Sequence, residues 1–352
     1  MPLTHLIELT GLALKTGASD LFLAEDAPAR LKIGGMMQEL PDHPVTTADL
    51  AAFWQECGAD PARTLDMDAA WRMPNGPRFR VNLHRHLGRL GAVLRQIRTD
   101  IPDLTTLGLP EELLISWLGR RSGLVLVTGP TGCGKSTTIA ASLERINSTR
   151  AAHIVTIEDP VEYVFQDRLS FFTQREVGLD TPTFGDGLRR AMRQAPDIIF
   201  VGEIRDAVTA LTALQAAETG HLVFSTLHSP NIAETIDRLV NLVPPHQREA
   251  MLSLLSNQTI GMLSQRLLPS ISSDRATLVC EYLEVEAAAR DWLRTLDIPA
   301  LTDFIKRGGN PHNRCYQASL VQAVQEGKVT FETAMANSSN AAEFSRSMRG
   351  VS

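Results

Sequence analysis

The segment Gly129–Ser136, which reads GPTGCGKS, constrains the fold of this chain more than any other part of its sequence. It contains every fixed position of a phosphate-binding loop, G-x-x-x-x-G-K-[ST]. The apolar run Leu124–Thr128 precedes it, and a helical stretch begins at Lys135. In such loops the backbone N–H groups and the N-terminus of the following helix bind phosphate oxygens together. The segment therefore predicts an α/β domain that binds a nucleoside triphosphate.

Residues of the loop have distinct expected contacts with the nucleotide. The glycines let backbone N–H groups converge on the phosphates, Lys135 reaches the β- and γ-phosphates, and the Ser136 hydroxyl coordinates Mg²⁺. Thr137 is expected at the α-phosphate. The predicted nucleotide-binding residues are Gly129, Thr131, Gly132, Cys133, Gly134, Lys135, Ser136 and Thr137.

The pattern on either side of the loop predicts an α/β protein with two domains. Residues 1–98 combine an amphipathic first helix with short strands, and residues 99–112 are rich in Pro and Gly, as in a linker. Residues 113–270 alternate apolar runs with helical stretches, which predicts a mostly parallel sheet covered on both faces. Within this range we expect a helix over 247–267, and residues 271–352 are predicted to form a C-terminal helical region.

Two acidic segments and a histidine stand at the expected ends of strands, where an open α/β sheet binds its ligands. The acidic segments are Thr156–Tyr163, TIEDPVEY, and Asp197–Glu203, an apolar strand that ends in Gly-Glu. Hydrolysis needs one acidic group that orients water and another that helps to hold the metal. His228 follows the next apolar strand, where a neutral imidazole can hydrogen-bond a γ-phosphate. A solvated carboxylate and a structural histidine are the alternative interpretations.

The composition of the chain restricts the classes of partner and the cellular compartment that we expect. The net charge of -6 disfavours binding to nucleic acid through the overall field of the protein, so we expect no direct nucleic-acid partner. The four cysteines form no CxxC pair and are interpreted as reduced thiols. No apolar run approaches the ~18 residues needed to span a bilayer, which predicts a soluble cytoplasmic protein.

Five segments occur along the chain in the order and spacing of one known family. They are the phosphate loop, TIEDPVEY, QREVGLDT, RQAPDIIFVGEIRD and AAETGHLVFSTLHS. With them the chain resembles the secretion-ATPase superfamily and, within it, the PilT/PilU branch that powers type IV pilus retraction and twitching motility. The resemblance covers nearly the whole chain. It implies a PAS-like N-terminal domain joined to a RecA-like ATPase domain with C-terminal helices.

The same resemblance implies an assembly and its partners. Members of the family are homo-hexameric rings that hydrolyse ATP with Mg²⁺, peripheral at the cytoplasmic side of the inner membrane. The implied partners at the pilus base are an inner-membrane platform protein and a paralogous retraction ATPase.

Individual roles also follow from the resemblance. Glu162 would be the general base, Glu203 would support Mg²⁺ and the attacking water, and His228 would lie near the γ-phosphate. Arg80 and Arg95 would come from the N-terminal domain and stabilise charge on the phosphoryl oxygens, an effect worth ~10³–10⁵ in rate in related systems. ATP held between the two domains would then draw them together.

The resemblance is compatible with more than one kind of ATPase within the superfamily. Extension and type II secretion ATPases carry a large extra N-terminal domain and a four-cysteine module, and the lack of both here favours retraction. Retraction ATPases also carry an Ala-Ile-Arg-Asn type motif, where this chain reads Ala288-Ala289-Arg290-Asp291. An accessory PilU-like paralogue and a secretion or DNA-uptake ATPase are therefore alternatives to the main motor.

Two further alternatives come from other functional classes. A non-hydrolysing ATP-binding scaffold is disfavoured because the phosphate loop and both glutamates, Glu162 and Glu203, are present. A small-molecule kinase would need an acceptor-binding lid, for which the chain offers no candidate segment.

Overall fold

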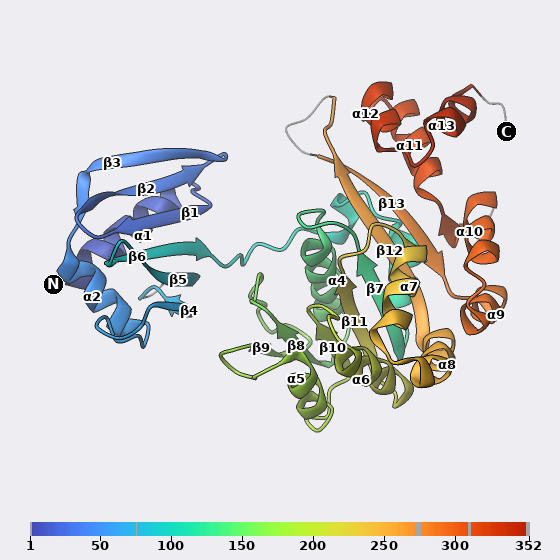
Figure 1. The fold of residues 1–352 in the computed structure, drawn as a ribbon, viewed down its shortest axis with the longest axis horizontal. Coiled ribbons are helices and arrows are strands. Elements are labelled where there is room, and N and C mark those ends of the chain that lie inside the picture. Colours follow the sequence, from blue (N-terminus) through green and yellow to red (C-terminus); the bar gives the residue numbers. More distant parts are fainter. Residues whose placement is uncertain (1, 75, 272–275, 309–310, 350–352) are drawn as a thin grey trace. The chain divides into compact units, whose positions relative to one another are not determined.

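The computed structural model describes residues 2–74, 76–271, 276–308 and 311–349 and contains two structural units. One unit comprises the chain up to Thr99 together with Glu162–Val164, and the other comprises Asp100–Val161 and the chain from Phe165 onward (Figure 1). Each unit has its own β-sheet, and thirteen α-helices lie in the described residues. The expected α/β class is confirmed.

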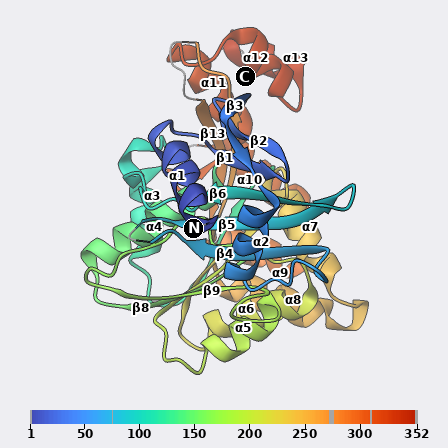
Figure 2. The same cartoon turned by 90° about the vertical axis from the view of Figure 1, so that its left-hand side faces the viewer.

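The N-terminal unit is an antiparallel sheet covered by two helices (Figure 2). Alternate strand residues such as Leu21 and Leu23 pack with Trp54 in one buried core. The sequence did not predict β4, because this strand at the edge of the sheet contains two Asp residues, a type that is depleted in strands. The elements are α1 (Pro2–Lys15), β1 (Asp20–Ala24), β2 (Ala27–Ile33), β3 (Met36–Val45), α2 (Thr47–Glu56), β4 (Asp66–Arg72), β5 (Arg78–His86) and β6 (Arg89–Gln96), with the strands in the order β3-β2-β1-β6-β5-β4.

The second unit is built on an eight-stranded sheet in the order β14-β13-β12-β7-β11-β10-β8-β9. Its strands are β7 (Gly123–Thr128), β8 (His153–Glu158), β9 (Phe171–Glu176), β10 (Ile198–Val201), β11 (Leu222–Leu227), β12 (Thr259–Leu268), β13 (Thr277–Glu284) and β14 (Asn313–Arg314). Neighbours from β12 to β9 run parallel, and β13 and β14 run antiparallel. The carboxyl ends of the parallel strands therefore meet at one edge.

Helices cover both faces of this sheet. Leu124 and Leu126 of β7 pack with α5 to α10, whereas Val125 and Val127 pack with α3 and α4. The last three helices form a smaller core beside β12 and β13, shown in red in Figure 1. The helices are α3 (Glu111–Leu118), α4 (Lys135–Thr149), α5 (Phe184–Ala191), α6 (Ala207–Glu218), α7 (Ile232–Leu242), α8 (Arg248–Gln258), α9 (Ala287–Thr295), α10 (Ile298–Arg307), α11 (Tyr316–Gln325), α12 (Phe331–Asn337) and α13 (Ala341–Met348). Within the described residues, no helix is both long enough and apolar enough to cross a membrane.

Three predictions from the sequence differ from the structure. The helix expected over 247–267 ends at Gln258, and β12 follows it. Most of β12 is buried on both faces, so its sequence lacks the alternation that would distinguish a strand from a helix. The region 271–352, expected to be helical, contributes β13 and β14 to the sheet. The expected linker, 99–112, contains a short 3-10 helix whose Leu104 is buried in the core.

The close packing of α3 against β12 predicts how a substitution at Gly261 changes the stability of the protein. A Cβ added at Gly261 would collide with the indole ring of Trp117, which is fully buried. Gly261→Ala should lower the free energy of unfolding by about 1–3 kcal/mol, as is typical of overpacking. Urea unfolding measures this, with Gly119→Ala as control because its added Cβ would meet no atom closer than 3.5 Å. Equal stability of the two variants would contradict the packing argument.

Candidate nucleotide-binding site

The phosphate loop connects β7 to α4 at the carboxyl edge of the parallel strands. Gly129, Gly132 and Gly134 have φ values of 138°, 79° and 92°, which glycine adopts without strain. A Cβ at Gly129 would collide with the carbonyl oxygen of Gln265, so only glycine lets the loop lie against β12. At Gly132 and Gly134 an added Cβ would meet no atom within 4 Å. This open space over the loop fits a phosphate chain.

Lys135 is the first residue of α4, and only 7% of its surface is exposed. Its Nζ donates hydrogen bonds to the carbonyl oxygens of Gly129, at 2.8 Å, and Pro130, at 3.0 Å. A buried ammonium group needs such acceptors because removing it from water is costly. A phosphate oxygen over the loop can replace either carbonyl as acceptor.

The first turn of α4 supplies hydroxyl groups and is anchored to β12. Ser136 and Thr137 are partly exposed there, where a hydroxyl can act as an oxygen ligand for Mg²⁺. Nε2 of Gln265 donates a 2.8 Å hydrogen bond to Oγ1 of the buried Thr138. Cys133 is buried in the loop, and this burial raises the pKa of its thiol. Sequence reasoning missed Gln265, because its contact depends on a strand that was not predicted.

Carboxylates from two neighbouring strand ends meet at Arg205. This guanidinium forms an ion pair with Glu203, which follows β10, and its Nη1 lies 3.5 Å from Oδ2 of Asp159, which follows β8. Only 13% of the Glu203 side chain is exposed. The hydroxyl of Thr226 donates a 2.6 Å hydrogen bond to the carbonyl oxygen of Gly202, which fixes the backbone just before Glu203. Sequence reasoning did not single out Arg205, although its place in GEIRD beside Glu203 was a signal.

His228 follows β11 and connects these carboxylates to the phosphate loop. Its Nε2 lies 3.5 Å from Oε2 of Glu203, and its Nδ1 lies 3.4 Å from both Oγ1 of Thr131 and Nζ of Lys135. An ammonium group can only donate, so we assign Nδ1 as the acceptor and place the imidazole proton on Nε2, facing Glu203.

The pKa of His228 lies below its ordinary value. Burial is the largest cause and the Lys135 cation the next, and together they outweigh the opposing attraction of Glu203. The imidazole is therefore neutral at neutral pH. A neutral ring can exchange hydrogen bonds with a phosphate without adding a second charge beside Lys135.

Glu162 lies in the segment that belongs to the N-terminal unit. Its side chain is exposed, and its carbonyl oxygen accepts a 3.2 Å hydrogen bond from the backbone N–H of Arg98. This pairing continues at Val164, whose N–H donates to the carbonyl oxygen of Arg98 at 2.9 Å. The loop that follows β8 is thus tied to the chain that follows β6.

Arg80 and Arg95 lie on adjacent strands of the N-terminal unit and are paired in register. Nε of Arg95 donates a 2.7 Å hydrogen bond to the buried Asp20. Burial alone would raise the pKa of Asp20, but hydrogen bonds, above all from Arg95, hold it below its usual value. Arg80 lies 4.0 Å from Asp68, and 42% of its side chain is exposed. The side chain of Arg95 is also exposed, at 63%.

Comparison with known proteins gives one consistent family. The family described as type II/IV secretion system protein matches residues 4–320. The type IV pilus retraction ATPase PilT of Pseudomonas aeruginosa is 37% identical over 93% of this chain and 96% of its own length. The type IV pilus ATPase PilU of the same organism is 33% identical over 95% of this chain and 88% of its own length.

Solved structures agree with these relatives. The crystal structure of the pilus retraction motor PilT with bound ADP has a TM-score of 0.88 and 38% identity, covering 97% of this chain and 98% of that one. The ATPase DotB of Legionella pneumophila has a TM-score of 0.81 at 26% identity, over 96% of this chain and 95% of its own.

The electrostatics of His228 predict two pKa changes of opposite sign. Lys135→Met removes a nearby positive charge and should raise the pKa of His228, whereas Glu203→Gln removes a negative charge and should lower it. NMR titration of the imidazole resonances measures both. Lys306→Met is the control, because Lys306 is not among the charges that shift His228. Shifts in the same direction for the two site variants would contradict the assigned contacts.

Proposed function

Because the chain belongs to the type II/IV secretion system protein family, we propose that it is a motor that hydrolyses ATP to drive type IV pilus retraction and twitching motility. It is a P-loop ATPase. The observation that carries the proposal is that a complete phosphate loop, Glu203 and His228 meet at one sheet edge. They do so in a chain whose relatives over nearly its full length include pilus motors.

In the proposed reaction the residues of the second unit bind and orient the nucleotide. The loop and Lys135 hold the phosphates, and Ser136 and Glu203 supply oxygen ligands for Mg²⁺. When bound, Mg²⁺ offsets the negative charge of the β- and γ-phosphates. Glu203 has to exchange its ion pair with Arg205 for this role. The neutral His228 then hydrogen-bonds the γ-phosphate from its place beside Lys135.

The remaining groups complete the proposed chemistry. Glu162 accepts the proton of the attacking water as general base. Arg80 and Arg95 stabilise the charge that builds on the γ-phosphoryl oxygens. Support for these roles is the matching position of each residue in the family motifs, together with the exposed side chains of both arginines.

The proposed assembly is a homo-hexamer that acts on an inner-membrane platform protein at the pilus base, from the cytoplasmic side. In this proposal the N-terminal unit is a PAS-like domain and the second unit a RecA-like domain. A six-stranded antiparallel sheet with two helices, and a parallel sheet with a phosphate loop, support these two assignments.

An accessory PilU-like role is the second candidate function. The observation that favours it is the sequence Ala288-Ala289-Arg290-Asp291 near the start of α9. This sequence retains only the first alanine and the arginine of the Ala-Ile-Arg-Asn motif expected in retraction motors. A purified protein that hydrolyses ATP by itself would favour the main motor. Turnover that appears only with a second retraction ATPase would favour the accessory role.

The proposed roles of Lys135 and Glu162 predict different defects. Lys135→Ala should reduce ATP turnover to background, because the phosphates lose their bound cation. Glu162→Gln should keep ATP binding and lower kcat by about 10²-fold or more, as expected for loss of a general base. Phosphate release and nucleotide binding measure the two effects, with Glu218→Gln, exposed at the end of α6, as control. A wild-type rate in Glu162→Gln would show that another group is the base.

The proposed phosphate contact of Arg80 predicts a loss of rate without a loss of fold. Arg80→Ala should lower kcat at least about tenfold, because a guanidinium that stabilises transition-state charge is missing. Steady-state turnover and a circular dichroism spectrum check the two parts of this expectation. Arg63→Ala is the matched control, since 90% of the Arg63 side chain is exposed in the same unit. Equal rates in the two variants would rule out the contact.

A further inference from the structure

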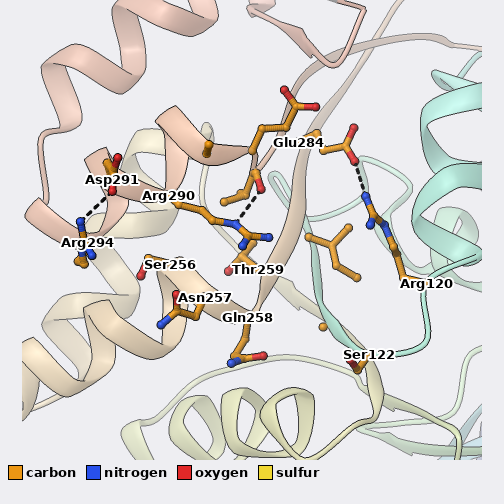
Figure 3. Close-up of a pocket in the computed structure, with 15 residues that line it drawn as sticks. Arg120, Ser122, Ser256, Asn257, Gln258, Thr259, Glu284, Arg290, Asp291 and Arg294 are labelled. Atoms are coloured by element: carbon orange, nitrogen blue, oxygen red, sulfur yellow. Dashed lines mark hydrogen bonds and ion pairs between the residues drawn. The ribbon is translucent and has the colours of Figure 1, made fainter.

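A cavity of about 540 Å³ lies in the second unit, at the sheet edge opposite the phosphate loop (Figure 3). Gly123, the first residue of β7, lines it, whereas the loop follows Thr128 at the other end of the same strand. Six residues of strand span ~20 Å, so the cavity is separate from the nucleotide site. Its walls are polar, with arginines and carboxylates from β13, from α9 and the residue before it, and from the chain that follows α3.

Three side chains that can bind a metal stand together beside this cavity. Glu284 ends β13, Glu286 directly precedes α9, and His312 precedes β14. One ligand atom from each lies within 4.8 Å of the other two. Glu284 and Glu286 line the cavity, and Figure 3 shows Glu284 at its wall. The backbone holds the group in place, because the N–H of Glu284 donates a 2.9 Å hydrogen bond to the carbonyl oxygen of His312.

We propose that Glu284, Glu286 and His312 bind a divalent transition-metal ion, with Zn²⁺ as the best match. Two carboxylate oxygens and one imidazole nitrogen are ligands that Zn²⁺ takes, and three protein ligands leave a fourth position for water. The cavity beside the two carboxylates has room for that water. The harder ions Mg²⁺ and Ca²⁺ prefer sets made only of oxygen ligands, which the imidazole excludes here.

Arg120 supplies the outer contact that metal-binding carboxylates usually have. Its Nη2 donates a 3.2 Å hydrogen bond to Oε1 of Glu284, while Oε2 of the same carboxylate contacts Nδ1 of His312. Figure 3 shows the guanidinium of Arg120 directed at this carboxylate. The second carboxylate oxygen is in direct contact with His312, and an ion bound to both side chains would replace this contact. Only 7% of Glu284 is exposed, and Arg120 and His312 compensate its charge in place of water.

A buried hydroxyl group is a second, independent observation that indicates a ligand in the same cavity. Oγ1 of Thr259 has no hydrogen-bond partner within the described residues. Because only 1% of Thr259 is exposed, bulk solvent does not supply one either. Thr259 lines the cavity together with both glutamates. Buried polar atoms in native proteins nearly always have a partner. A metal-bound water in the cavity would supply one.

The proposed ion would close a loop in the C-terminal part of the chain. Helices α9 and α10 lie between Glu286 and His312, so one ion bound to both would fix the ends of that helical pair. Arg290, the retained arginine of the family motif, lies on α9 and lines the same cavity. The proposal goes beyond the proposed motor function, and binding of the ion does not depend on ATP hydrolysis.

The test is Zn²⁺ binding by the full-length protein without nucleotide or Mg²⁺. Protein freed of metal with a chelator is dialysed against micromolar ZnCl₂, and the bound metal is measured by elemental analysis. We expect one Zn²⁺ per chain and a higher unfolding temperature than in the metal-free protein. Glu286→Gln and His312→Gln should each weaken Zn²⁺ binding at least about tenfold, since loss of even an outer-shell partner costs 10–100-fold.

Matched controls separate this site from adventitious binding. Glu249→Gln and His246→Gln remove the same side-chain types at exposed positions and should bind Zn²⁺ as the wild type does. Circular dichroism of Glu286→Gln, whose side chain is exposed, shows whether lost binding reflects lost fold. No Zn²⁺ on the wild type would overturn the proposal. Unchanged binding in both site variants would also overturn it and would place the ion elsewhere, for example at cysteine thiols.

Discussion

The burial of the Lys135 ammonium group among the carbonyls of its own loop is the interaction on which the rest of the nucleotide site depends. Its positive charge is one cause of the low pKa of His228, and its donor hydrogens decide which imidazole nitrogen is an acceptor. The imidazole proton then faces Glu203, whose carboxylate also pairs with Arg205. A phosphate bound to Lys135 would therefore change the hydrogen bonds of His228 and Glu203, which follow two neighbouring strands.

The scaffold allows this arrangement because the loop lies directly against β12. Gly129 has no Cβ to collide with the backbone of Gln265, and the Gln265 amide in turn bonds to Thr138 on α4. The phosphate loop is thus held by β7 before it, α4 after it and β12 beside it. Such support fixes the positions of its backbone N–H groups before any nucleotide arrives.

The part of the site that the sequence predicted is the part governed by local rules. The loop motif demands a strand, a positive-φ turn and a helix, and the structure has all three at the expected residues. Strands β12 and β13 were missed because buried strands resemble helices in sequence, and Gln265 was missed with them. The contact of Arg205 with Asp159 arises only because β8 and β10 are neighbours in the sheet. The roles of Glu162, Arg80 and Arg95 stay predictions from the family motifs.

One measurement tests most directly the proposal that this chain is a ring motor that hydrolyses ATP. ATP turnover by the purified protein should be recorded together with its mass in solution, with and without nucleotide. The account predicts turnover by a particle of hexameric mass. Tight ATP binding by a monomer or dimer with negligible turnover would contradict it and would favour an ATP-binding scaffold.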